Sequence, residues 1–112
     1  MVTPREERLA KNEALFRGVN ERVRDVKGDA ADPEERIRFV CECGRETCLE
    51  EVELTVAEYE ATRSVSTQFV VKPGHELADV ERVLTENARY SVVEKHEEEA
   101  AVARRTDPRE GR

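Results

Sequence analysis

The sequence predicts an α+β protein, in which a long N-terminal helix is followed by a small, mostly antiparallel sheet with two short helices, in the order ββαβαβ. Two observations indicate this class. Apolar residues recur with helical spacing over the first quarter of the chain, and the later apolar runs are short and rich in β-branched residues. With 112 residues, the chain is long enough for one domain and little more.

An amphipathic helix is predicted within residues 1–28, because apolar residues recur there every three or four positions. Gly28 is a suitable stop, and residues 29–35 form a linker that contains Pro33. The apolar stripe of the helix consists of Leu9, Phe16, Val19, Val23 and Val26. Such a stripe predicts a protein partner or self-association through this helix, or else packing of the helix on its own sheet.

Residues 36–96 are predicted to form one α+β domain. Residues 36–41 alternate in polarity and predict a strand, and residues 52–54 predict its hairpin partner. Residues 68–72 and 90–94 are short runs rich in valine and predict two further strands. The order of these runs indicates a small antiparallel sheet.

Two short helices are predicted between the strands. Thr55 and Glu58 have the spacing of a capping box, which predicts a helix that ends near Arg63. Residues 77–88 predict a second helix, because apolar residues recur with helical spacing at Leu77, Val80, Val83 and Leu84. Residues 97–112 are highly charged and are expected to form a flexible tail, in which a helix can begin at Glu97 but does not extend into the proline- and glycine-containing segment 107–111.

The net charge of −7 is concentrated in the middle of the chain. Residues 29–93 carry seven basic and fifteen acidic groups, whereas residues 1–28 carry seven basic and five acidic groups. An acidic domain repels phosphate backbones, which argues against direct nucleic-acid binding.

No apolar leader follows Met1, and no run approaches the roughly 20 apolar residues of a membrane span. We therefore expect a cytoplasmic protein without a membrane segment.

The segment from Cys41 to Cys48 has the pattern CxCGxxxC. Side chains two apart on an extended strand point to the same face, so Cys41 and Cys43 can hold one ion. Gly44 permits a sharp turn that returns Cys48 to the other two. Three cysteines cannot all pair internally, and converging thiolates in a reducing compartment favour Zn²⁺. The sequence therefore predicts a zinc knuckle that staples a small core.

A closed structural zinc site needs a fourth ligand. The chain has two histidines. His75 follows a predicted strand and the Pro73-Gly74 turn, which is a rigid position for an imidazole, whereas ordering His96 in a charged segment would cost more entropy. We therefore predict His75 as the fourth metal ligand. The alternatives are His96, Glu42, Glu46, Glu76 or a water molecule.

The eight-residue pattern CxCGxxxC resembles the post-SET zinc knuckle, in which three cysteines join a distant fourth ligand. The chain lacks the catalytic sequence of the SET domain, so this resemblance implies no methyltransferase activity. A wider pattern, over residues 12–109, resembles a family of small actinobacterial zinc-knuckle proteins without an assigned activity, and implies an actinobacterial, cytoplasmic protein. That pattern consists of Phe39-Val40-Cys41-Glu42-Cys43-Gly44, Cys48, Leu54-Thr55, Glu58-Tyr59, Phe69-Val70-Val71, Pro73-Gly74-His75-Glu76 and Tyr90-Ser91-Val92-Val93-Glu94-Lys95.

These features favour a non-enzymatic zinc protein that acts as a protein-interaction or regulatory module. A redox-responsive zinc–thiolate switch is an alternative, because thiolate ligands can be oxidised. A zinc-dependent hydrolytic enzyme is a further alternative and would need water as the fourth ligand. Its support is small, because the PCxxC element of zinc deaminases, phosphate-binding glycine loops and dinucleotide fingerprints are all absent from the sequence.

Overall fold

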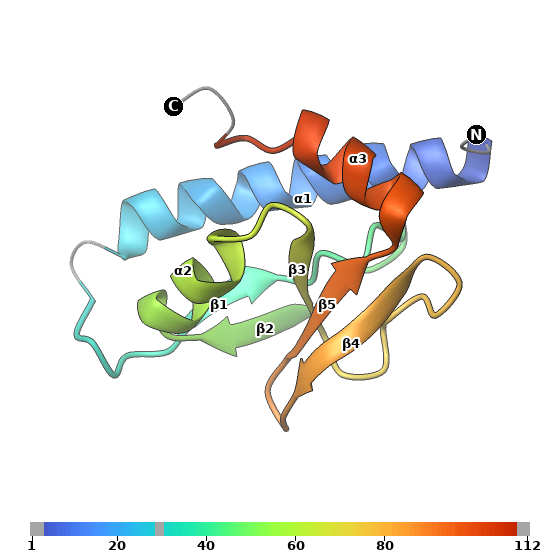
Figure 1. The fold of residues 1–112 in the computed structure, drawn as a ribbon. Coiled ribbons are helices and arrows are strands. Elements are labelled where there is room, and N and C mark those ends of the chain that lie inside the picture. Colours follow the sequence, from blue (N-terminus) through green and yellow to red (C-terminus); the bar gives the residue numbers. More distant parts are fainter. Residues whose placement is uncertain (1–3, 29–30, 110–112) are drawn as a thin grey trace.

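The computed structural model describes residues 4–28 and 31–109, so the expected segments 1–28, 29–35 and 97–112 each extend beyond the described residues. The elements are α1 (Pro4–Lys27), β1 (Ile37–Val40), β2 (Glu51–Leu54), α2 (Val56–Arg63), β3 (Gln68–Val71), β4 (Glu81–Glu86), β5 (Ser91–Lys95) and α3 (Glu97–Arg105). The α+β class with a long N-terminal helix is confirmed. Helix α1 lies across the strands, with α3 beside it (Figure 1).

The strands form two antiparallel sheets rather than one. β1 pairs with β2, and the second sheet has the order β3-β5-β4. Across the first pair, Phe39 faces Val52 and Ile37 faces Leu54, so the buried residues of both strands share one face. Helix α2 follows directly and begins with the predicted capping box at Thr55.

Two hydrophobic clusters fill the interior, and the second sheet separates them. In the first cluster, the rings of Phe39 and Tyr59 stack with centroids 4.4 Å apart. Alternation along β3 directs Val70 into the first cluster and Phe69 and Val71 into the second. The second cluster consists of Cys41, Cys43, Phe69, Val71, Val93 and Ala103. Two of the predicted metal ligands are therefore core residues.

The helix predicted over residues 77–88 is wrong, because this segment contains strand β4. The pairing of β4 with β5 shifts register between Val83 and Thr85. Leu84 is the extra residue at this bulge, so the strand does not alternate between apolar and polar side chains there. Two apolar residues, Val83 and Leu84, therefore follow each other in the sequence. Together with the apolar residues before β4, this pair imitates helical spacing in the sequence.

Residues 97–105 of the segment expected to be a tail form α3, which begins at the residue where a helix was expected to start. Ala100 and Ala103 are buried, and α3 packs against α1 and β5. Their spacing places both alanines on one face of the helix, where small side chains allow close approach. Alanine adds little to an apolar pattern, so periodicity did not indicate that this helix packs against the core.

Helix α1 docks on the sheets through polar side chains. Its buried residues are Glu13, Arg17, Asn20 and Glu21. Within the apolar stripe expected from the sequence, Val23 packs against the first cluster, and Leu9 and Phe16 are half-buried. Val19 and Val26 are 41% and 71% exposed. The stripe is therefore split between the protein's own core and its surface.

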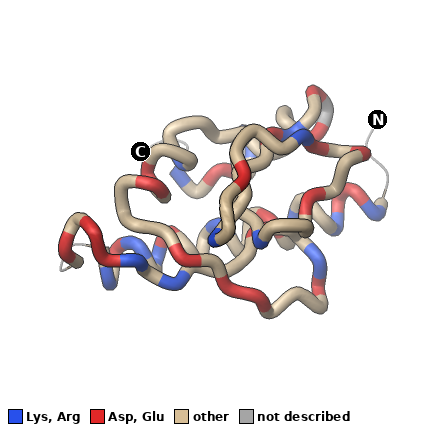
Figure 2. The backbone as a smooth tube through the Cα atoms, turned by 90° about the horizontal axis from the view of Figure 1, so that it is seen from below, with Lys and Arg blue, Asp and Glu red and all other residues tan. Residues whose placement is uncertain are grey.

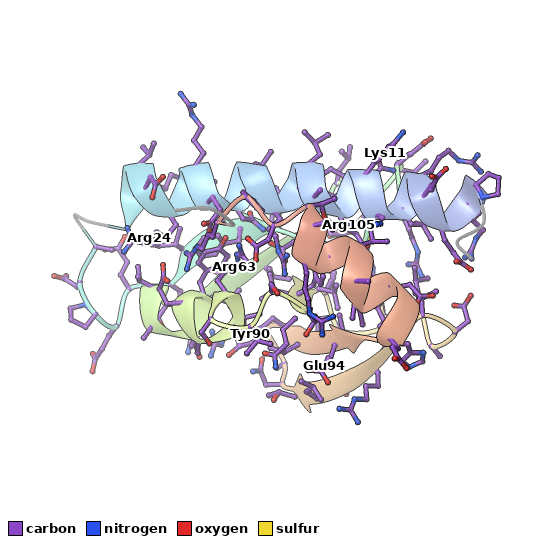
Figure 3. The ribbon with its side chains drawn as sticks, turned by 45° about the horizontal axis from the view of Figure 1, so that its top comes forward. Lys11, Arg24, Arg63, Tyr90, Glu94 and Arg105 are labelled. Carbon is purple, nitrogen blue, oxygen red and sulfur yellow. The ribbon has the colours of Figure 1, made fainter. Side chains whose placement is uncertain are left out.

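Charged residues are interspersed along the described backbone rather than collected at one end of the molecule (Figure 2). Some are buried: the Arg17 guanidinium lies 3.8 Å from the ring centroid of Phe69, and Arg63 Nη2 donates to Asp107 Oδ1 at 2.5 Å. Figure 3 shows Arg63 in the space between α1 and α2. Ion pairs thus connect the helices in a chain with few apolar residues.

None of the helices in residues 4–28 and 31–109 has the length and apolar character needed to cross a membrane.

Candidate metal centre

The first two cysteines lie on an extended segment that joins the two sheets. The backbone N–H of Cys41 donates to Glu50 O at 3.0 Å and so continues the β1–β2 ladder. The N–H of the next residue, Glu42, donates to Val70 O on β3 at 2.8 Å. Because successive side chains alternate, Cys41 and Cys43 share one side of this segment and Glu42 takes the other.

A tight turn returns the third cysteine to the first two. Gly44 has φ +80°, a left-handed conformation that side chains with a Cβ adopt at a cost. The Cys48 N–H then closes a turn by donating to Arg45 O at 3.1 Å. Helix α1 supports this loop, because Asn12 Nδ2 donates to Gly44 O at 2.9 Å. The knuckle loop, residues 44–47, is thus held between two cysteines and α1.

The histidine comes from the turn after β3. Gly74 has φ +91°, and the His75 N–H donates to Lys72 O at 2.9 Å, which closes this turn. His75 Nδ1 lies 3.7 Å from Cys41 Sγ and 3.6 Å from Cys48 Sγ. The structure therefore brings together three cysteines and a histidine from two separate parts of the chain.

The four side chains have a geometry that suits one metal ion. The Sγ atoms of Cys41, Cys43 and Cys48 and a ring nitrogen of His75 all lie within 4.8 Å of one another. In a tetrahedron with metal–sulfur bonds of about 2.3 Å and metal–nitrogen bonds of about 2.0–2.1 Å, the sulfur–nitrogen edge is about 3.6 Å. The two measured sulfur–nitrogen separations are close to that edge. The cluster can therefore hold a tetrahedral ion.

The surroundings of the three sulfur atoms favour the thiolate form at Cys43 and the thiol form at Cys41 and Cys48. The Lys72 N–H donates to Cys41 Sγ at 3.2 Å. A hydrogen bond from the Cys41 thiol lowers the pKa of Cys43 to about 4, and a backbone hydrogen bond from Arg45 acts in the same direction. The same thiol pairing is the main reason that the pKa of Cys41 is raised. Burial raises the pKa of Cys48, against a backbone hydrogen bond from Glu50. Each sulfur thus has its own backbone N–H donor, as expected around a metal-bound thiolate.

The alternatives for the fourth ligand lie elsewhere. Glu42 is fully buried on the opposite side of the segment, where it accepts from Val70 N at 3.0 Å and from Asn20 Nδ2 at 2.8 Å. His96 is exposed at the N-terminus of α3, and Glu46 is exposed on the knuckle loop. Among the described residues, Glu76 is not part of the group of ligand atoms that converges on this point.

Sequence reasoning did not identify the buried polar residues that connect α1 to the segment around Cys41 and to the second sheet. Asn20 contacts both Val40 and Glu42 through its side-chain amide. Lys95 on β5 lies between two buried carboxylates, those of Glu13 and Glu81. A polar residue inside an amphipathic pattern was the only available signal, and it does not say which partner the residue meets.

Comparison of the chain with known protein families, with curated proteins and with solved structures found no match.

Proposed function

We propose that this protein is a non-enzymatic protein-interaction or regulatory module in which one structural Zn²⁺ is held by Cys41, Cys43, Cys48 and His75. The observation that carries the proposal is the convergence of three sulfur atoms and one ring nitrogen within 4.8 Å. Zinc suits this donor set because it accepts thiolate and imidazole in a tetrahedron.

The completeness of the donor set supports a structural role. Catalytic zinc sites keep a position for water or substrate, whereas structural sites take four protein ligands. Here the half-buried His75 is close enough to the sulfur atoms to provide the fourth donor. The hydrolytic alternative would require water in the place of that imidazole.

The position of the site also supports a structural role. Cys41 and Cys43 belong to the second hydrophobic cluster, and the knuckle loop is bonded to α1 through Asn12. A metal here would join the ends of β1 and β3 and the loop that α1 supports. In small domains of this kind, the free energy of metal binding contributes directly to folding.

Helix α1 is the partner-binding element in this proposal. Its stripe of Leu9, Phe16, Val19, Val23 and Val26 is only partly used by the core, and Val19 and Val26 remain exposed. The zinc-stapled sheets would then serve as the platform on which α1 is displayed. A reducing cytoplasm fits the thiolate ligands.

Metal analysis tests the proposal. Wild-type protein purified without added chelator should contain about one zinc per chain. Cys48→Ser should lose nearly all zinc and unfold partly, and His75→Ala should bind zinc much more weakly. His96→Ala is the matched control, because His96 is exposed and its side chain makes no capping hydrogen bond. Full-affinity zinc in His75→Ala would remove His75 from the ligand set, and metal-free wild type that folds normally would refute the structural role.

A redox-responsive zinc–thiolate switch is the second candidate. Its motivating observation is that Cys48 is only half-buried, which leaves one ligand accessible to oxidants. Oxidation of two thiolates to a disulfide by hydrogen peroxide would release zinc and form water. Stoichiometric peroxide should then release zinc, which a colorimetric chelator detects. Retention of zinc for hours under these conditions would exclude the redox switch and keep only the structural role.

A further inference from the structure

The outer side of α1 is both apolar and basic. Leu15, Val19 and Val26 are exposed there, and their spacing places them on one face of the helix. Four exposed basic residues flank them: Arg8, Lys11, Arg22 and Lys27. We call these seven residues the basic strip. Its character contrasts with the net charge of −7 of the whole chain.

Within residues 4–28 and 31–109, the cations of the basic strip do not contribute ion pairs to the fold. On the inner side of α1, Arg17 pairs with Asp107, and Arg24 pairs with Glu60. By contrast, the four cations of the strip make no ion pair with any residue in the described part of the chain. Figure 3 shows Lys11 on the side of α1 that faces away from the strands. These charges are therefore available to an external anion.

Two shallow, open depressions lie along this side of α1. One has a volume of about 330 Å³ and is lined by Val19, Val23 and Val26 between Arg22 and Lys27. The other, of about 260 Å³, lies between the start of α1 and the knuckle loop. Its lining includes Arg8, Leu9, Asn12, Gly44 and Arg45. From Arg8 to Val26 the helix rises about 27 Å, so both depressions can contact one rod-like partner.

We propose that the basic strip docks an acidic amphipathic helix of a partner protein, an inference that rests on the proposed role as an interaction module. Apolar side chains of the partner would cover Leu15, Val19 and Val26, and its carboxylates would pair with the flanking cations. The charge of the basic strip distinguishes between a partner protein and a second copy of this chain as its occupant. A second copy of α1 would bring its own basic strip against this one, which like-charge repulsion opposes.

Two designed peptides test the charge and the shape of the partner. Both are 18-residue amphipathic helices with leucine at positions i, i+3, i+4 and i+7, and they differ only in having glutamate or lysine on the flanks. Each is titrated into zinc-loaded, ¹⁵N-labelled protein and followed by amide chemical shifts. We expect saturable binding of the glutamate peptide, with shifts confined to α1 and the knuckle loop, and at least tenfold weaker binding of the lysine peptide.

Matched variants locate the surface. Val19→Glu and Arg22→Glu should each weaken binding of the glutamate peptide at least tenfold. Leu84→Glu is the control, because Leu84 is 42% exposed and Val19 is 41% exposed, but Leu84 lies on β4. Its affinity for the peptide should equal that of the wild type.

Several results would overturn the proposal: no saturable binding up to 1 mM peptide, equal binding of the two peptides, or equal losses in Val19→Glu and Leu84→Glu. Binding through the same amides to phosphatidylserine vesicles or duplex DNA, without binding of the peptide, would assign the strip to a different anion and also overturn it. Zinc content is measured on the same sample. If the protein contains zinc but does not bind the glutamate peptide, only the proposed docking surface is refuted. If the protein contains no zinc but binds the peptide, only the proposed metal role is refuted.

Discussion

The side-chain amide of Asn20 on α1 pairs with both backbone groups of Val40, the last residue of β1. Its Oδ1 accepts from Val40 N at 2.7 Å, and its Nδ2 donates to Val40 O at 2.9 Å. The same Nδ2 donates to Glu42 Oε2 at 2.8 Å. Because Val40 immediately precedes Cys41, this amide positions the segment that carries the first two predicted ligands.

Replacing Asn20 by alanine should therefore destabilise the protein. The substitution leaves the Val40 N–H and C=O and the Glu42 carboxylate without this partner in a largely buried place, and each lost partner costs about 1–3 kcal/mol. We expect the free energy of unfolding in urea, with zinc present, to fall by about 2–4 kcal/mol. Arg22→Ala, on the exposed side of the same helix, should change it by less than about 0.5 kcal/mol. Similar values for both variants would show that Asn20 does not position β1.

Gly44 and Gly18 should respond to alanine in opposite directions. A Cβ at Gly44 would lie 2.8 Å from Glu13 Cγ and 2.9 Å from Leu9 O, and the backbone there is left-handed. We expect Gly44→Ala to lower the free energy of unfolding by about 2 kcal/mol and to weaken zinc binding. Gly18 has open space around it inside α1, so Gly18→Ala should stabilise by about 0.5–1 kcal/mol. Thermal unfolding with calorimetric detection measures both, and tolerance of Gly44→Ala would contradict the close packing of the knuckle loop on α1.

Asp107 compensates two buried arginines. Its carboxylate contacts Arg63 Nη2 at 2.5 Å and Arg17 Nη1 at 3.8 Å. Asp107→Ala leaves two buried guanidinium groups without this counter-charge, which costs about 3–5 kcal/mol in comparable buried pairs. Arg105→Ala is the control, because Arg105 is exposed on α3 (Figure 3). If urea midpoints of the two variants coincide, the segment after α3 does not contribute to stability.

We expect the buried carboxylate of Glu13, which pairs with Lys95, to make the stability of the protein depend on pH. Burial raises the pKa of Glu13 to about 7 from its ordinary value of 4.5, although the adjacent Lys95 ammonium acts in the opposite direction. Between these two pH values the folded state binds more protons than the unfolded state, so the contribution of Glu13 to stability falls as pH rises from 4.5 to 7. The loss is about 1–3 kcal/mol.

Comparison with Glu13→Gln isolates this contribution, because other titrating groups are common to both proteins. We expect the variant to gain stability relative to the wild type as pH rises through this window, as followed by urea unfolding at fixed zinc. In the variant, the Lys95 ammonium still has the carboxylate of Glu81 as a hydrogen-bond partner. A difference between the two proteins that is constant from pH 4.5 to 8 would contradict the raised pKa.

The sequence alone was sufficient for several local features of this protein. The four-residue strand β1, the capping box of α2 and the long helix α1 follow from patterns of neighbouring residues, and all are present in the structure. The grouping of Cys41, Cys43 and Cys48 also follows from short-range geometry, since a strand, a glycine turn and a return occupy only eight residues. His75 was selected from two histidines by its position after a strand and a turn, and the structure places it beside the thiols.

Only the tertiary structure decided how α1 docks and that β4 and α3 lie on either side of the predicted strand β5. Periodicity locates apolar faces, but α1 is buried through Glu13, Arg17 and Asn20, whose partners lie 20 or more residues away. A bulge in β4 imitated a helix, and the buried face of α3 consists of alanines that leave almost no apolar pattern. Hydrogen bonds and ion pairs between distant residues depend on three-dimensional proximity, and no spacing within the chain encodes that proximity.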